Sequence, residues 1–145
     1  MRKQLISWNS VRRFFVLVFA LLLVTMVWLF VTHDAQERFA LSTGEVLRLV
    51  GDTGSVVLDV RTAEEFRSET GHISGAINIS SQKLVSRLSE LDSARGRHLI
   101  VYCRTQNRSR KAAEVLRGNG FDAKFMMGGI IQWNREKKPV VREEP

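Results

Sequence analysis

The sequence predicts an α/β domain in which a parallel sheet of about five strands is flanked by helices, preceded by one transmembrane helix. Two observations lead to this prediction. Short apolar runs alternate with helix-like segments over residues 42–140, and alternation with short connections requires a parallel sheet covered on both faces. Residues 14–31 form a continuous apolar run in which Thr25 is the only polar residue.

The apolar run over residues 14–31 has the length of a membrane span. At ~1.5 Å per residue it extends roughly 27 Å, close to the hydrocarbon thickness of a bilayer. Arg12 and Arg13 precede it, and Asp34 follows it. The positive-inside rule therefore places residues 1–13 in the cytoplasm as a basic flank and the rest of the chain across the membrane. Residues 32–41 are predicted to be a linker, and residues 141–145 a loose tail beyond Pro139.

Two other interpretations of this segment are open. A cleaved signal peptide requires small residues one and three positions before the cleavage site, and none is suitably placed after Thr25. The Arg12-Arg13 pair followed by Phe15 is weakly similar to a twin-arginine signal, but its flanking positions fit poorly. An uncleaved anchor in the inner or plasma membrane, with the domain periplasmic or extracytoplasmic, is the preferred prediction.

Composition excludes several classes of function. The chain has 145 residues, with 22 Lys and Arg against 15 Asp and Glu, and a formal charge of +7. Four of the basic residues lie before residue 14, so the excess does not indicate a nucleic-acid surface, and no basic stripe interleaved with aromatics occurs. The single cysteine excludes an internal disulfide and a cysteine-cluster metal site. We therefore expect no metal, no organic cofactor and no nucleic-acid partner.

The soluble part is predicted to alternate strands and helices. Ser42 or Thr43 can cap a first helix, and Thr62 a second that contains Glu65, because Ser and Thr are favoured N-caps. The predicted strands are residues 56–60, 76–79, 99–103 and 122–127, and the predicted helices are residues 45–50, 63–66, 81–91, 109–117 and 130–133.

Cys103 lies at the centre of this arrangement. The apolar run 99–102 ends at this cysteine, a polar and basic loop follows, and the pattern becomes helical up to Gly118. A side chain in that position lies at the carboxyl edge of a parallel sheet, facing the amide end of the next helix. Helix dipole, amide donors and nearby guanidinium groups stabilise a thiolate there. The pattern thus predicts an activated nucleophile, although a lone cysteine at a strand end is also common as a small core residue.

Five sequence features together resemble the rhodanese-like sulfurtransferase domain. The resemblance covers roughly residues 41–140. It depends on DVR at 59–61, EF at 65–66, GHI-x-GA-x-N at 71–78, VYC at 101–103 with the loop to Arg108, and GG-x-x-x-W at 128–133. The chain thus resembles a single-domain rhodanese behind an N-terminal membrane anchor.

This resemblance implies a thiosulfate or persulfide sulfurtransferase whose nucleophile is Cys103. The thiolate takes the outer sulfur of a small anionic donor as a cysteine persulfide, and a thiol or other nucleophile removes it. The resemblance places the substrate-binding donors on the loop after the cysteine, whose residues are Arg104, Thr105, Gln106, Asn107, Arg108 and Ser109. Asp59 in its apolar run needs a partner, and Arg61 can supply one, which gives this pair a structural role near the site.

Two details of the loop affect the prediction. Four residues separate Cys103 from Arg108, whereas a phosphatase loop needs five, and Ser109 occupies that place; a phosphatase or arsenate reductase is therefore disfavoured. The family often has Gly where this chain has Gln106. If the loop requires a positive φ there, the substitution costs ~1 kcal/mol or more and affects turnover and donor preference.

Two further functions remain as alternatives. The first is a non-catalytic domain of the same fold that binds or regulates a partner at the membrane, which Gln106 favours. The second is a redox or detoxification enzyme that uses Cys103 with an external thiol. In the preferred prediction the acceptor is a thiol, on a small molecule or on a protein.

Overall fold

The computed structural model of the chain describes residues 8–142. The chain divides into two compact units, residues 1–38 and residues 39–145. Both core clusters of the protein lie within the second unit.

The first unit is one long helix, α1, Trp8–Glu37. Its stretch Val11–Phe30 has a mean hydropathy of 2.5 and is long and apolar enough to cross a membrane, and none of it is buried in the protein. The predicted helix over 14–31 is confirmed. Helix α1 continues to Glu37, so the first part of the predicted linker, residues 32–41, is helical. Residues 32–37 contain no Gly or Pro, and Ala, Gln and Glu are good helix formers.

The second unit is built on a five-stranded sheet in which every neighbouring pair is parallel, in the order β1-β5-β4-β2-β3. The predicted fold class is therefore confirmed. The strands are β1 Ala40–Leu41, β2 Ser55–Asp59, β3 Ile77–Asn78, β4 His98–Tyr102 and β5 Asp122–Met126. Strand β1 was predicted to be linker; it consists of two residues paired with Phe125 and Met126, too short for a periodic signal.

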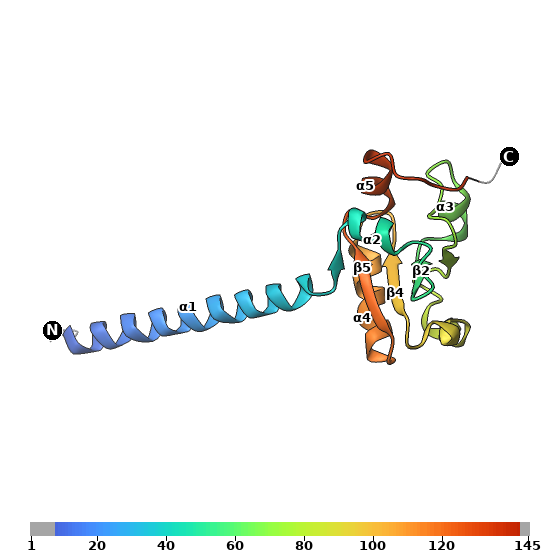
Figure 1. Cartoon of the computed structure of the whole chain (residues 1–145). Helices are drawn as coiled ribbons and strands as arrows, with labels where there is room; N and C mark the ends of the chain where they lie inside the picture. Colours follow the sequence, from blue (N-terminus) through green and yellow to red (C-terminus); the bar gives the residue numbers. More distant parts are fainter. Residues whose placement is uncertain (1–7, 143–145) are drawn as a thin grey trace. The chain divides into compact units, whose positions relative to one another are not determined.

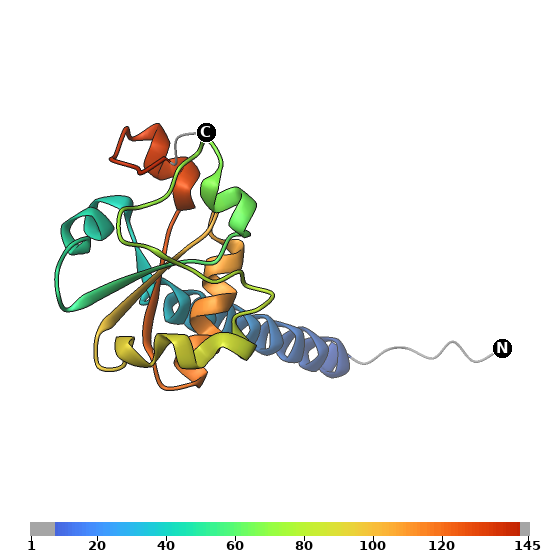
Figure 2. The same cartoon turned by 90° about the vertical axis from the view of Figure 1, so that its right-hand side faces the viewer.

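Helices cover both faces of this sheet (Figures 1 and 2). They are α2 Thr43–Leu49, α3 Ala63–Arg67, the 3₁₀ helix η1 Val85–Ala94, α4 Asn107–Gly118 and α5 Gly129–Arg135. Alternate residues of β4 point to opposite faces. Leu99 and Val101 pack with buried residues of η1 and α4, whereas Ile100 and Tyr102 pack with residues of α2 and α5.

The two predicted helix caps are confirmed. Ser42 and Thr62 are the N-caps of α2 and α3, and each accepts a bond from the backbone N–H three residues on. Glu45 and Glu65 return the bond to the cap backbone, which completes a capping box at both helices.

The predicted α-helix over residues 81–91 is wrong. The segment forms turns and then the 3₁₀ helix η1, with non-helical φ and ψ at Arg87. It is rich in Ser, and Ser hydroxyls compete with the helix for backbone groups; Ser86, for example, donates to the carbonyl of Lys83. Of the expected apolar face, Leu84 and Leu91 are buried but Val85 is 68% exposed.

The expectation that order ends at Pro139 is also wrong. Val141 forms an antiparallel bridge with His72, through backbone bonds of 2.9 and 2.8 Å. His72 in turn stacks on Phe66, with ring centroids 3.9 Å apart. Gly71 permits this approach, since a Cβ atom there would lie 2.6 Å from the carbonyl oxygen of Val141.

Candidate active site

Cys103 follows β4 directly and is 1% exposed. Its side chain belongs to the core cluster formed with η1 and α4. The backbone N–H of Ser109 lies 3.4 Å from the sulfur, and the thiol donates to Ser109 Oγ at 3.6 Å. The sulfur is thus buried beside the backbone N–H and the hydroxyl of Ser109.

Helix α4 begins earlier than the sequence indicated, and this explains the Ser109 contact. The loop after Cys103 comprises only residues 104–106, because α4 starts at Asn107. Ser109 is therefore in the first turn, where backbone N–H groups have no acceptor within the helix. The sulfur of Cys103 accepts the hydrogen bond of one of them, the N–H of Ser109. In this geometry the positive end of the helix dipole is directed toward the sulfur.

The first turn of α5 holds the cysteine loop from the other side. Ile130 N–H donates to the carbonyl of Cys103 at 2.9 Å, and Ile131 N–H donates to the carbonyl of Arg104 at 3.2 Å. In a trans peptide the C=O and the following N–H point in opposite directions. The N–H groups of Arg104 and Thr105 are therefore directed away from α5.

Gly129 makes this contact between α5 and the loop possible. Its φ is +56°, and a Cβ atom would lie 2.2, 2.5 and 2.6 Å from the carbonyl oxygens of Thr105, Cys103 and Arg104. Gly128 before it also has a positive φ, +71°, and its N–H donates to the side chain of Gln106 at 2.9 Å.

The strain expected at Gln106 is absent. Its φ is −159°, which any residue adopts, and its side chain accepts the hydrogen bond from Gly128. The left-handed residues near the site are Gly128 and Gly129 instead. Gln106 therefore joins the loop to α5 and carries no backbone penalty.

Arg108, which the sequence analysis placed among the substrate-binding residues, is paired with a carboxylate in this structure. Its guanidinium binds both carboxylate oxygens of Glu65 at 2.6 and 2.7 Å, with its own side chain 37% exposed. This bond to Arg108 holds the pKa of Glu65 at about 2. Among the other loop residues, Arg104, Thr105 and Asn107 are exposed and Ser109 is buried.

Asp59 and Arg61 form a buried ion pair at the same edge of the sheet. Their closest atoms are 2.7 Å apart, and the side chains are 0% and 1% exposed. Arg61 also donates to the carbonyls of Glu65 and Gly71 and to Thr70 Oγ1. One guanidinium thus joins β2 to helix α3 and to the turn at residues 70–71.

Tyr102 and Glu65 are site residues that the sequence analysis missed. The hydroxyl of Tyr102 accepts the N–H of Ile73 at 3.1 Å, and burial, with Asp59 nearby, raises the pKa of Tyr102. No local pattern distinguishes this tyrosine from a core residue. In the sequence Glu65 appeared only as a member of the second predicted helix and of the EF pair at 65–66, and its pairing with Arg108, 43 positions away, depends on tertiary contact.

The comparisons with known proteins agree with this geometry. Residues 42–136 match the rhodanese-like domain family. The Escherichia coli (strain K12) protein YibN is 29% identical over 125 residues, which cover 85% of each chain. A rhodanese-related protein from Thermoplasma volcanium superposes with a TM-score of 0.65 at 31% identity, covering 72% of this chain and 98% of that chain.

A thiosulfate sulfurtransferase from Pseudomonas aeruginosa also has this fold. It superposes with a TM-score of 0.65 at 25% identity, over 77% of this chain and 22% of that chain. A parallel five-stranded sheet with a cysteine loop between β4 and α4 defines a rhodanese fold. The chain belongs to the rhodanese-like domain family, which includes sulfurtransferases.

Replacing Gly129 by Ala is predicted to break the contact between the loop and α5. The clash with three carbonyl oxygens and the left-handed backbone together should lower the free energy of unfolding by roughly 3 kcal/mol or more. Chemical denaturation of the chain in detergent micelles measures this.

Two controls separate the causes of that effect. Gly75→Ala tests the backbone alone, with φ +73° and no atom near the added methyl group, and should cost roughly 1 kcal/mol. Gly118→Ala, in an open position of α4, should be neutral or stabilising. Equal losses for Gly129→Ala and Gly75→Ala would contradict the proposed clash.

The Glu65–Arg108 pair is predicted to make stability depend on acid pH. The pKa of Glu65 is lowered from 4.5 to about 2, so its contribution is complete above pH 4.5 and is lost as the pH falls toward 2. Because the pair is partly exposed, that contribution is on the order of 1 kcal/mol.

The variant Glu65→Gln tests this, since Gln keeps the capping box but removes the charge. Unfolding free energies of the variant should vary less between pH 4.5 and 2 than those of the unaltered chain. Glu114→Gln, at an exposed position of α4, should leave the pH dependence unchanged. If Glu65→Gln loses as much unfolding free energy between pH 4.5 and 2 as the unaltered chain, the Glu65–Arg108 pair is not the cause of the pH dependence.

Proposed function

We propose that the protein is a membrane-anchored sulfurtransferase that carries sulfane sulfur on Cys103. The observation that carries the proposal is the hydrogen bond from the Ser109 N–H, in the first turn of α4, to the sulfur of Cys103. Oriented amide donors and the helix dipole stabilise a thiolate or an anionic persulfide without a metal or an organic cofactor. The match to a family that includes a thiosulfate sulfurtransferase supports the same assignment.

In the first step the Cys103 thiolate attacks the outer sulfur of thiosulfate. The new bond joins Cys103 Sγ to that sulfur, the sulfur–sulfur bond of thiosulfate breaks, and its electron pair leaves with sulfite. The product is the anionic persulfide of Cys103. The N–H groups of Arg104 and Thr105, directed away from α5, are the further donors proposed for its outer sulfur. Exposed Arg104 adds a positive charge that attracts the donor.

In the second step an acceptor thiolate attacks the outer sulfur of the persulfide. A sulfur–sulfur bond to the acceptor forms, the bond to Cys103 breaks, and the Cys103 thiolate returns with that electron pair. Cys103 is the only cysteine of the chain, so the acceptor thiol belongs to another molecule. A persulfide donor reacts by the same two steps.

A non-catalytic binding domain is the second candidate, and the 1% exposure of Cys103 favours it. A thiol used only for packing titrates as an ordinary alkaline thiol and reacts slowly with alkylating reagents. A catalytic thiol beside the amide end of α4 reacts with them at neutral pH. The rate of Cys103 alkylation measured against pH distinguishes the two candidates.

Incubation with thiosulfate is predicted to add the mass of one sulfur atom to the full chain in detergent micelles, because the persulfide is a covalent intermediate. Intact-protein mass spectrometry measures the adduct, and a thiol acceptor should remove it. Cys103→Ser should gain no mass, whereas Ser86→Ala, at an exposed hydroxyl on η1, should gain it normally. Absence of the adduct with thiosulfate and with persulfide donors would falsify the proposed transfer.

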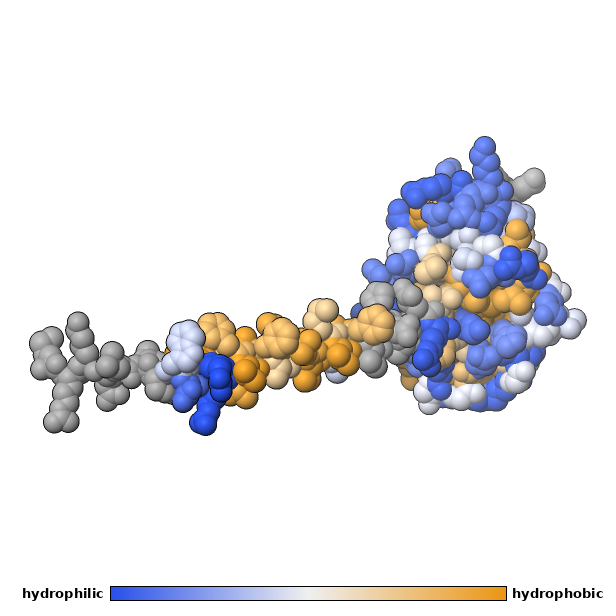
Figure 3. Space-filling view, turned by 60° about the vertical axis from the view of Figure 1, so that its left-hand side comes forward, coloured by the Kyte–Doolittle hydropathy of each residue, from blue (hydrophilic) through white to orange (hydrophobic). Residues whose placement is uncertain are grey.

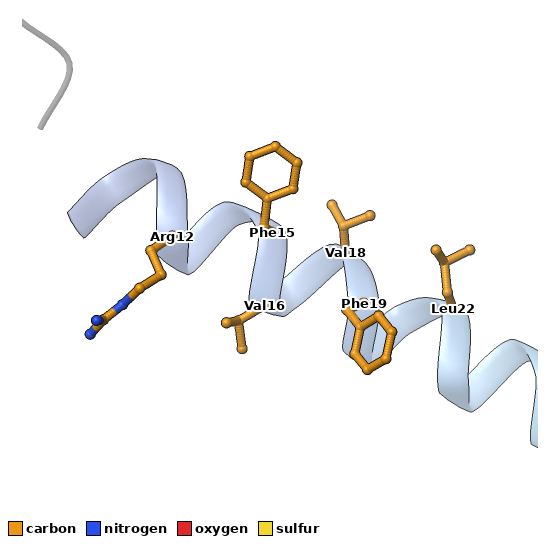
Figure 4. A pocket seen from close by; sticks show the side chains of 6 residues that line it. All are labelled: Arg12, Phe15, Val16, Val18, Phe19 and Leu22. Atoms are coloured by element: carbon orange, nitrogen blue, oxygen red, sulfur yellow. The ribbon is translucent and has the colours of Figure 1, made fainter. Parts of the chain in front are cut away.

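Helix α1 is proposed as the membrane anchor. Figure 3 shows hydrophobic residues along its visible face, with the hydrophilic side chains near its start. Close by, Phe15, Val18 and Leu22 project outward from the helix, and Arg12 lies nearer its start (Figure 4). Apolar side chains that radiate from one helix suit lipid chains, and Arg12 suits the headgroup region.

The anchor is predicted to keep the chain in the membrane fraction after alkaline carbonate washing, because an apolar helix of this length is stable only in lipid. An alkaline phosphatase reporter fused after residue 145 should be active, since it requires an oxidising extracytoplasmic compartment. A matched green fluorescent reporter should be dark in the same position. Release of a shortened chain into the soluble fraction would instead indicate a cleaved signal sequence.

A further inference from the structure

A hollow of about 250 Å³ lies between helix α4 and the start of η1. Its lining includes Arg108, Lys111 and Val115 on α4 and Leu84 and Val85 at the start of η1. The two helices cover the same face of the sheet, and their buried residues pack in one core cluster (Figure 2). The hollow is therefore bounded by two elements that the core holds together.

The lining of this hollow is open to solvent. Val85 is 68% exposed, Val115 is 38% exposed, and the side chain of Arg108 is 37% exposed. Within the described residues after α1, five large apolar side chains are exposed, and two of these five, Val85 and Val115, line this hollow. Single exposed apolar residues are ordinary, but two that share a hollow form a surface on which another molecule can pack.

The hollow is also positively charged. Arg108 and Lys111 are part of its lining, which contains no carboxylate. Arg108 is paired with Glu65, whereas Lys111 is exposed and forms no ion pair with any described residue. A carboxylate that approaches Lys111 therefore gains a partner without breaking an existing pair.

The hollow adjoins the cysteine site through α4. Arg108 precedes Ser109, whose N–H donates to the sulfur of Cys103. The hydrogen bond to Glu65 raises the pKa of Arg108, and the charge of the nearby Cys103 adds to this increase. Val115 follows Ser109 by six residues, which at ~1.5 Å per residue is roughly 9 Å along the helix. The hollow thus extends from the first turn of α4 to roughly 9 Å beyond the residue that contacts the sulfur.

The size of the hollow favours a protein over a small molecule as its occupant. Sites for small ligands have volumes of roughly 300–1,000 Å³, and this hollow, at about 250 Å³, is below that range. One aliphatic side chain of a protein fits such a volume. An anchoring side chain in an apolar recess, with charged groups at its rim, is the usual arrangement at protein–protein interfaces.

We propose that this hollow binds the protein that accepts sulfur from Cys103, with an aliphatic side chain of that protein on Val85 and Val115 and a carboxylate on Lys111. The inference rests on the proposed sulfur transfer, in which the acceptor thiol belongs to another molecule. The thiolate of the partner attacks the outer sulfur of the persulfide, and a sulfur–sulfur bond forms on the partner. The bond to Cys103 breaks, and the Cys103 thiolate leaves with its electron pair.

The test compares discharge of the Cys103 persulfide to short thiol peptides. The full chain in detergent micelles is loaded with thiosulfate, excess donor is removed, the persulfide is verified by intact mass, and its loss is followed over time. The probe is the acetylated and amidated peptide Cys-Gly-Gly-Leu-Glu, in which three residues at ~3.3 Å place the leucine roughly 10 Å from the thiol. Matched peptides have Ser in place of Leu or Gln in place of Glu.

The probe should discharge the persulfide at least tenfold faster than either matched peptide. The small thiol 2-mercaptoethanol, which has neither an aliphatic branch nor a carboxylate, is the reference acceptor. Each rate is corrected for the reactivity of that thiol toward a reference disulfide, because neighbouring charges change the reactivity of a thiol.

Variants connect this preference to the hollow. Lys111→Glu and Val85→Ser should each lower the ratio of the probe rate to the 2-mercaptoethanol rate at least fivefold. Lys137→Glu makes the same charge reversal at an exposed position outside the lining, and Leu47→Ser removes an exposed apolar side chain from α2. Both control variants should keep the ratio of the unaltered chain.

Several results would overturn the proposal. Equal rates for the probe and the Ser peptide would show that charge alone attracts the acceptor, and equal ratios for Lys111→Glu and Lys137→Glu would show that the hollow is not where it binds. If the persulfide forms and is discharged by 2-mercaptoethanol while all peptides react alike, only the docking inference fails. If no persulfide forms, the proposed sulfur transfer fails and the docking inference fails with it. Should Val85→Ser fail to fold, Lys111→Glu decides the test.

Discussion

The cysteine loop depends on two backbone hydrogen bonds from the first turn of α5. Ile130 and Ile131 hold the carbonyls of Cys103 and Arg104, and the peptide geometry then directs the following N–H groups away from α5. Gly129 is the residue that lets the backbones approach this closely. The site is therefore shaped mainly by main-chain contacts, so the side chains of the loop can vary without moving the amides.

A second set of contacts fixes the opposite side of the loop. The buried Asp59–Arg61 pair joins the end of β2 to the backbone of α3, and Glu65 on that helix binds Arg108 on α4. Buried charges of this kind are costly unless every donor is satisfied, and Arg61 meets this requirement with bonds to Thr70 and Gly71. Arg108 thus joins α4 to α3 through Glu65.

Local patterns predicted most of the fold, and tertiary contacts account for what they missed. Continuous apolar runs identified β2 and β4 because strands buried on both faces carry no polar alternation. The caps at Ser42 and Thr62 were predictable because Ser and Thr are favoured N-caps. The sequence placed Cys103 and Ser109 in one loop, and the structure brings them into contact. The pairing of Arg108 with Glu65 and the two-residue strand β1 arise from segments far apart in the chain, which no local pattern encodes.

The bridge between Val141 and His72 links a buried charge to a segment far away in the chain. His72 lies next to Gly71, whose carbonyl accepts a hydrogen bond from Arg61, and Val141 pairs with His72 through two backbone hydrogen bonds. Fraying of the chain at Val141 would therefore remove a support from the turn that binds the buried guanidinium.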